Sequence, residues 1–158
     1  MTDNPPGLPA VVKHGTVSRA LFCVIAALSL AGMIVSAVSL QRHYAKSATS
    51  YCEFGEKFNC DIVNRSQYSS LMGIPVAGIG VAGYGLLLVV AAVQRLHPQT
   101  PTRLLLAALA GLAFALYLTY IEGFVLETWC ILCLTSLALI ALITVLAGFL
   151  KLSHPRDS

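Results

Sequence analysis

The residues of this chain best suited to chemistry are two cysteines, Cys130 and Cys133, which open the last of four long apolar stretches. A Cys-x-x-Cys pair at a helix N-terminus favours thiol–disulfide exchange, because the positive end of the helix dipole lowers the pKa of a thiol there. The second sulfur can then resolve a mixed disulfide formed by the first. Two buried, unreactive thiols are the alternative interpretation, since buried cysteines are common. The pair therefore indicates a redox centre only in combination with other cysteines.

A second pair, Cys52 and Cys60, lies in a polar segment between the first two apolar stretches, with seven residues between the two cysteines. The pair could form a labile redox disulfide or a structural disulfide that pins the segment. A zinc site built from both pairs is a poor match, because zinc ligands usually come in two short spacings of two to four residues. We therefore expect no metal site, and both kinds of disulfide stay open at this point.

Composition places the chain in a membrane, because 57% of its 158 residues are hydrophobic and 11% are charged, whereas soluble domains carry about 25% charged residues. About 20 apolar residues cross a bilayer as a helix. Spans without a charged residue are predicted at residues 20–40, 74–93, 104–121 and 130–150. The net charge of +3 comes from scattered basic residues, which argues against nucleic-acid binding. We predict an all-α membrane protein, a bundle of four transmembrane helices.

The predicted organisation is a single membrane domain, residues 19–151, between two short tails. Residues 1–18 are rich in proline and are expected to form a disordered cytoplasmic tail, and residues 152–158 a second cytoplasmic tail. Residues 41–73 form the one long connection, an extracytoplasmic loop in which Asp61–Tyr68 is predicted to be a short helix.

Orientation follows from the lysines and arginines in the short flanks, since these favour the cytoplasmic side. Six lie on the side of the two termini and four on the other side, so both termini are predicted to be cytoplasmic. Counting spans then places the loop at residues 41–73 and Cys130 outside, where disulfides persist. Cys23 lies near the cytoplasmic end of the first span and cannot join the other four cysteines.

Together these residues resemble the vitamin K epoxide reductase family. The resemblance covers roughly residues 20–150. It rests on the two cysteine pairs with their spacings, on Asp-Ile-Val-Asn-Arg-Ser at residues 61–66 and on Gly-Ile-Pro-Val at residues 73–76. The short loop after Cys60 resembles bacterial members more than vertebrate ones. Many bacterial relatives continue into a fused thioredoxin-like domain, whereas this sequence stops at Ser158, so we expect a separate partner.

The resemblance implies a four-helix bundle around a quinone, with electrons supplied by a thioredoxin-like protein. Carried over by position, Cys52 would receive electrons from the partner and Cys60 would attack Cys130. Cys133 would face the quinone ring. Ser66 matches a family serine near the active site, which makes it a candidate quinone-binding residue.

The resulting expectation is a thiol:quinone oxidoreductase in a bacterial-type inner membrane. It would oxidise a periplasmic dithiol protein, reduce ubiquinone or menaquinone, and so drive disulfide formation. One alternative is a quinone or vitamin K epoxide reductase that uses a dithiol as reductant. Vertebrate members carry a tyrosine four residues after the second cysteine of the Cys-x-x-Cys pair, and Leu137 at that position argues against epoxide reduction. The other alternative is a non-catalytic four-span protein with structural disulfides.

Three further features are ambiguous in the sequence. Glycines at positions 78, 80 and 83 spell a dinucleotide-binding motif, but inside an apolar span they indicate close helix packing or room for a flat ring. Glu122 and Glu127 flank the Cys-x-x-Cys pair, and either could hand protons to a quinone or simply be solvated at the interface. Thr128 is expected to cap the fourth span.

Overall fold

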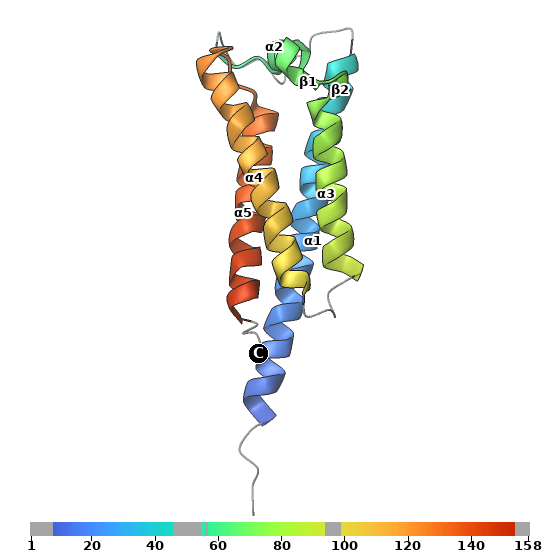
Figure 1. The fold of residues 1–158 in the computed structure, drawn as a ribbon, viewed down its shortest axis with the longest axis vertical. Coiled ribbons are helices and arrows are strands. Elements are labelled where there is room, and N and C mark those ends of the chain that lie inside the picture. The colour runs from blue at the N-terminus through green and yellow to red at the C-terminus, as the bar shows by residue number, and fades with distance from the viewer. Residues whose placement is uncertain (1–7, 46–54, 56, 94–98, 154–158) are drawn as a thin grey trace, which may run out of the picture.

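The computed structural model describes residues 8–45, 55, 57–93 and 99–153. Four long helices run along one axis (Figure 1). They are α1 (Leu8–Tyr44), α3 (Val76–Val93), α4 (Thr100–Phe124) and α5 (Ile131–Ser153). All four are long and apolar enough to cross a bilayer, which confirms the predicted four-helix membrane bundle.

Large apolar side chains point away from the bundle along all four helices, as expected for helices surrounded by lipid. Leu30, Leu86, Leu116 and Val145 are between 45% and 58% exposed. A continuous apolar surface of this kind would drive aggregation in water but is compatible with a hydrocarbon solvent.

The tightly packed core occupies the half of the bundle nearer the N-terminus of α1 and the C-terminus of α5. Ile25, Leu104, Ile143 and Leu150 are fully buried there, one or two from each of three helices. In this half α1 packs on α3 and on α5, while α4 packs on α5. The other half of the bundle opens into a cavity that is described below.

Most of the predicted helix ends differ from the structure, and two of these differences have a clear physical reason. Helix α1 begins at Leu8, so part of the predicted disordered tail is helical. Pro9 lies in the first turn of α1, where a missing N–H is tolerated, so proline at this place starts a helix and does not exclude one. Helix α4 continues past the predicted end at residue 121 to Phe124, because the carboxylate of Glu122 finds hydrogen-bond partners inside the protein.

The connection between α1 and α3 folds over one end of the bundle (Figure 1). Its elements are α2 (Cys60–Arg65), the 3₁₀ turn η2 (Gln67–Ser69) and a hairpin of β1 (Ser70–Leu71) and β2 (Ile74–Pro75). Helix α2 and η2 confirm the short helix predicted over Asp61–Tyr68. The hairpin pairs antiparallel, with Ser70 opposite Pro75.

Local chemistry explains why this connection folds as it does. The side chain of Asn59 accepts hydrogen bonds from the backbone N–H groups of Asp61 at 3.0 Å and Ile62 at 3.1 Å, which caps α2. Met72 and Gly73 both have positive φ, 52° and 84°, as a tight two-residue hairpin turn requires. Gly73 adopts this conformation without the strain that a side chain adds.

The glycines of α3 fit both interpretations suggested by the sequence. A Cβ atom on Gly80 would lie 2.8 Å from the Ser36 hydroxyl of α1, so this glycine allows the two helices to pack closely. A Cβ atom on Gly83 would meet nothing within 4 Å, and Gly83 lines the cavity. One glycine therefore serves packing and the other leaves open space.

Candidate functional site

Cys130 occupies the N-cap position of α5. Its carbonyl accepts the first intrahelical hydrogen bond, from Leu134 N–H at 3.0 Å, and the helix begins at Ile131. The expectation that Thr128 caps this helix is wrong, because Thr128 lies two residues before the cap. Its backbone N–H instead donates to the carbonyl of Glu122 at 3.1 Å.

The surroundings of Cys130 favour its thiolate. A hydrogen bond from the Cys133 thiol lowers the pKa of Cys130, and hydrogen bonds from the backbone N–H groups of Cys133 and Leu132 act in the same direction. Burial and the negative charge of Glu122 oppose the shift, but the pKa stays below the ordinary thiol value. This is the effect expected of unpaired N–H groups at a helix N-terminus.

Backbone hydrogen bonds attach the segment before α2 to the segment before α5. Trp129 N–H donates to the Lys57 carbonyl at 2.8 Å, and Asn59 N–H donates to the Trp129 carbonyl at 3.2 Å. The next residue along each segment is a cysteine, Cys60 in one and Cys130 in the other. Both are fully buried in one small cluster with Val63. This short ladder therefore brings together two cysteines that lie 70 positions apart.

The five cysteines have different places and states. Cys60 is disulfide-bonded, while Cys130, Cys133 and Cys23 are free thiols. Cys23 is exposed on α1, as predicted outside the site. Cys52 lies outside the described residues, so its part in the site stays a prediction. The structure thus brings Cys60, Cys130 and Cys133 together at one end of the bundle.

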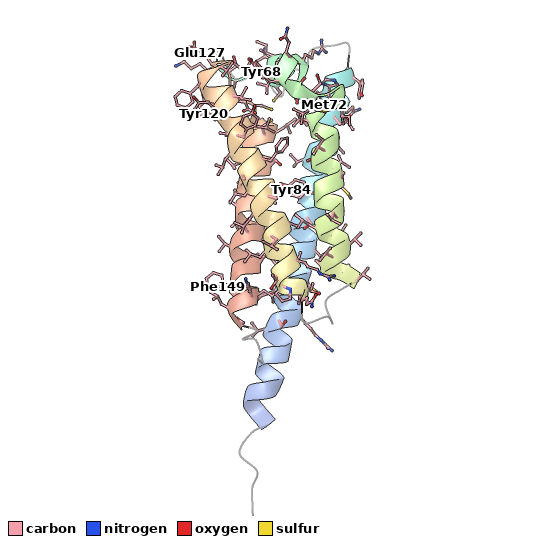
Figure 2. The ribbon with its side chains drawn as sticks, in the orientation of Figure 1. Tyr68, Met72, Tyr84, Tyr120, Glu127 and Phe149 are labelled. Carbon is pink, nitrogen blue, oxygen red and sulfur yellow. The ribbon has the colours of Figure 1, made fainter. Side chains whose placement is uncertain are left out.

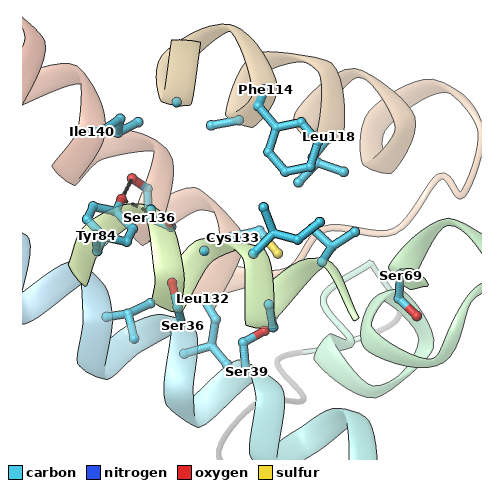
Figure 3. Close-up of a pocket in the computed structure, with 18 of the residues that line it drawn as sticks. Ser36, Ser39, Ser69, Tyr84, Phe114, Leu118, Leu132, Cys133, Ser136 and Ile140 are labelled. Atoms are coloured by element: carbon cyan, nitrogen blue, oxygen red, sulfur yellow. Dashed lines mark hydrogen bonds between the residues drawn. The ribbon is translucent and has the colours of Figure 1, made fainter. Parts of the chain in front are cut away.

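A cavity of about 430 Å³ extends from this cysteine cluster into the bundle. It lies between the α1–α3 pair and the α4–α5 pair, and α2 and η2 contribute to its outer end. Its lining is largely apolar. Figure 3 shows Cys133 among the lining side chains, across from Phe114 and Leu118 of α4. Cys133 therefore faces the cavity, while Cys130 faces the loop.

Polar groups line the cavity at two levels. Deep inside, the Tyr84 hydroxyl donates to the carbonyl of Ser136 at 2.8 Å and lies 3.0 Å from its hydroxyl (Figure 3). At the outer end, the Ser39 hydroxyl donates to Oδ1 of Asn64 at 2.7 Å. The other amide atom of Asn64, Nδ2, is buried and has no hydrogen-bond partner among the described residues.

Ser66 also lines the cavity, and its role in binding a quinone stays a prediction. It ends α2, and its hydroxyl donates to the Val63 carbonyl at 2.8 Å. His43 of α1 lies close by, with Nδ1 2.5 Å from the carbonyl of Asn64. The contact between His43 and Asn64 holds α2 against α1 at the mouth of the cavity.

Sequence reasoning missed Ser39, Asn64, Tyr84 and Ser136 as cavity residues. Three of them are polar residues inside apolar spans, and a polar group within a span is by default a candidate for function. That signal was available. The fourth, Asn64, comes one helical turn after Cys60 in a polar segment, where an asparagine gives no such signal.

The two acidic residues near Cys130 have opposite environments. Glu122 is 2% exposed, accepts a hydrogen bond from Cys130 N–H at 3.1 Å on Oε2, and interacts with the Cys133 side chain. Glu127 is exposed, with a positive φ of 49°, at the outer edge of the bundle (Figure 2). Only Glu122 lines the cavity.

A family model described as the vitamin K epoxide reductase family matches residues 23–147, a range that includes all four helices in whole or large part. The chain belongs to this family, as the resemblance in its sequence indicated. It is therefore a multi-pass membrane oxidoreductase related to vitamin K epoxide reductase. Members of the family generally use quinones as electron acceptors.

Proposed function

From its membership of this family, we propose that the protein is a thiol:quinone oxidoreductase. It takes two electrons from a thioredoxin-like dithiol protein and passes them to a quinone in the membrane. A disulfide forms in the partner and a quinol forms in the bilayer.

The observation that carries this proposal is that three cysteines pack together between the loop and the cavity. Cys60 and Cys130 share one buried cluster, and Cys133 is partly buried against it. Cys133 also lines the cavity. Thiol–disulfide exchange needs direct attack of one sulfur on another, so residues packed in this order form a plausible route for electrons.

The proposed steps balance atoms and electrons. A thiolate of the partner attacks Cys52 in a Cys52–Cys60 disulfide, and the partner's second thiol closes its own disulfide and leaves two thiols on the loop. Cys60 then attacks Cys130 in a Cys130–Cys133 disulfide, and Cys52 resolves the mixed bond. The loop disulfide is restored and Cys130 and Cys133 become thiols. The disulfide at Cys60 and the thiols at Cys130 and Cys133 support this order of steps.

In the last step the dithiol reduces the quinone. Two S–H bonds break, one S–S bond forms between Cys130 and Cys133, and two O–H bonds form on the quinone. The cavity suits this substrate in size, since about 150 Å³ accommodates benzene and about 430 Å³ is present. Phe114 and Leu118 would pack against the ring. The free amide N–H of Asn64 and the hydroxyl of Ser66 are candidates to hold a quinone oxygen near Cys133.

The same proposal includes an orientation. Both termini would be cytoplasmic, and the end of the bundle with α2 would face the periplasm or the exterior of a bacterial-type plasma membrane. The basic residues in the flanks support this arrangement. An oxidising compartment at that end would also be compatible with a stable loop disulfide.

Reduction of an epoxide and a purely structural role are the alternatives. A structural protein with two permanent disulfides agrees poorly with free thiols at Cys130 and Cys133. Leu137 stands where vertebrate members have tyrosine, which favours quinone over epoxide as acceptor. Assays of the purified protein with dithiothreitol and either acceptor separate the two reactions.

Substitution and trapping test the proposal. Cys133→Ala should abolish quinone reduction with dithiothreitol as electron donor, while Cys23→Ala, a change at an exposed cysteine outside the site, should leave it intact. In a Cys52→Ala variant, a Cys60–Cys130 disulfide should accumulate and be detectable by mass spectrometry. Normal turnover by Cys133→Ala, or failure of Cys60 and Cys130 ever to join, would refute the proposal.

A further inference from the structure

Glu122 is a buried carboxylate that contacts both residues of the Cys-x-x-Cys pair, and capping alone does not account for both contacts. Its Oε2 accepts Cys130 N–H at 3.1 Å, and the same carboxyl group interacts with the Cys133 side chain. A glutamate at the edge of a membrane span is energetically unfavourable unless it has partners or a function. The first contact closes the end of α5, but the second is made to a reacting atom.

The thiols of Cys130 and Cys133 have different groups near them that can assist their deprotonation. Cys130 lies at the helix end, where free backbone N–H groups of Leu132 and Cys133 stabilise its thiolate. Cys133 is the third residue of α5 and faces the apolar cavity, and among the described residues no backbone N–H group donates to its sulfur. Among the described residues, Glu122 is the acidic side chain that lines the cavity with it.

We infer that Glu122 is a catalytic residue that accepts the proton of the Cys133 thiol and delivers it to the quinone. This inference rests on the function proposed above. As the electron pair leaves Cys133, the S–H proton moves to the Glu122 carboxylate, and the Cys130 thiolate closes the Cys130–Cys133 bond. Glu122 then gives the proton to a quinone oxygen in the cavity that both residues line. The second quinol proton comes from solvent, which took up the proton that Cys130 released on forming its thiolate, and Glu122 ends as it began.

Glu122→Gln is the informative substitution, because the glutamine keeps an oxygen for Cys130 N–H and nearly the same volume but cannot accept the proton. Glu127→Gln removes an exposed carboxylate near the same rim and is the matched control. With dithiothreitol and a soluble quinone, Glu122→Gln should reduce kcat about 10²- to 10⁴-fold, the usual contribution of general acid–base catalysis. Glu127→Gln should stay within about 2-fold of the unmodified protein, within the variation usual for surface changes.

A second measurement separates catalysis from structure. In the Cys52→Ala background, Glu122→Gln should still form the Cys60–Cys130 disulfide at the normal rate, because that exchange needs correct positioning of Cys130 but no proton transfer to quinone. Loss of the crosslink together with activity would show that Glu122 only supports the end of α5, and would overturn the inference. So would a kcat within about 3-fold of the unmodified protein, far short of general acid–base catalysis.

The experiment also distinguishes this inference from the function on which it rests. If the Cys52→Ala protein forms the crosslink but the unmodified protein reduces no quinone, the proposed function is refuted, and the proposed role of Glu122 is refuted with it. If the unmodified protein reduces quinone and Glu122→Gln does so equally well, only the inference about Glu122 is refuted.

Discussion

Gly32 is the position at which a single methyl group should disturb the cavity most. A Cβ atom built on Gly32 of α1 would lie 2.3 Å from Cε1 and 2.5 Å from Cδ1 of the Tyr84 ring. Ordinary contacts of this kind begin near 3.4 Å, so the ring would have to move by about 1 Å. Tyr84 is 5% exposed and its hydroxyl is bonded to Ser136, so the ring has little freedom to move.

The expected loss of stability follows from these contacts. Forcing an extra methyl group against a buried ring costs about 1–3 kcal/mol. Loss of the Tyr84–Ser136 hydrogen bond adds about 0.5–1.5 kcal/mol. These two costs add to about 1.5–4.5 kcal/mol. Because alanine in a helix regains about 0.5–1 kcal/mol over glycine, Gly32→Ala should destabilise the protein by about 0.5–4 kcal/mol. Because Tyr84 also lines the cavity, the same variant should raise the KM for quinone.

Thermal unfolding of the purified protein in detergent or lipid discs, followed by far-UV circular dichroism, measures the first effect. Gly148→Ala is the matched control, because a Cβ atom there meets nothing within 4 Å. Alanine in a helix interior is favoured over glycine by about 0.5–1 kcal/mol, so the control should be at least as stable as the parent. Replacing Tyr84 by leucine should relieve most of the effect of Gly32→Ala. A Gly32→Ala protein as stable as the Gly148→Ala control would contradict the packing described here.

Three other predictions concern the site itself. Asn64→Ala should raise the KM for quinone about 5-fold, because loss of one hydrogen bond costs about 1 kcal/mol. An unchanged KM would show that Asn64 makes no hydrogen bond to the substrate. Because the pKa of Cys130 is lowered chiefly by its hydrogen bond with the Cys133 thiol, alkylation of Cys130 should persist to lower pH than for an ordinary thiol. In Cys133→Ala the midpoint of the curve of alkylation rate against pH should move to higher pH. An unchanged midpoint would mean that the Cys133 thiol does not lower the pKa of Cys130. Asn59→Ala removes the side chain that caps α2, so it should lower the free energy of unfolding by about 1 kcal/mol. It should also slow formation of the Cys60–Cys130 disulfide. An unchanged crosslinking rate would mean that the cap does not position Cys60.

Composition and the cysteine spacings were sufficient to predict the architecture, because each depends on local properties of the chain. An apolar stretch without charges predicts a span whatever its neighbours are, and counting spans places Cys60 and Cys130 at the same end of the bundle. The end of the third span was misplaced at residue 121 because that prediction also used only local properties of the chain. A charged residue normally ends an apolar span, and the hydrogen bonds that Glu122 makes inside the bundle involve a residue eight positions away.

The lining of the cavity could not be predicted in the same way, since it depends on how each helix is rotated about its axis. Ser39 and Tyr84 point inward, whereas Tyr117 and Tyr120 of α4 are more than half exposed. The sequence offers no clear difference between these tyrosines, all of which lie in apolar surroundings. The hydrogen-bond ladder between Asn59 and Trp129 could not be predicted from the sequence either, because it joins two irregular segments through backbone atoms alone.

The arrangement of the site explains why one helix end can serve both exchange with a protein thiol and reduction of a lipid-soluble quinone. Cys130 is the N-cap residue and lies against Cys60, so its reactivity is controlled by the backbone of α5 and directed toward the loop. Cys133, three residues later, faces the apolar cavity. Because charged intermediates are unfavourable in such surroundings, a proton must travel with the electrons. Glu122 comes from a different helix and contacts both residues. It is therefore placed to couple the two halves of the reaction, thiol exchange with Cys60 and reduction of the quinone. Glu122→Asp moves the carboxylate away from the cysteines, so it should slow quinone reduction more than exchange with Cys60. Equal slowing of both rates would mean that the two halves share a structural dependence on Glu122 and not a chemical one.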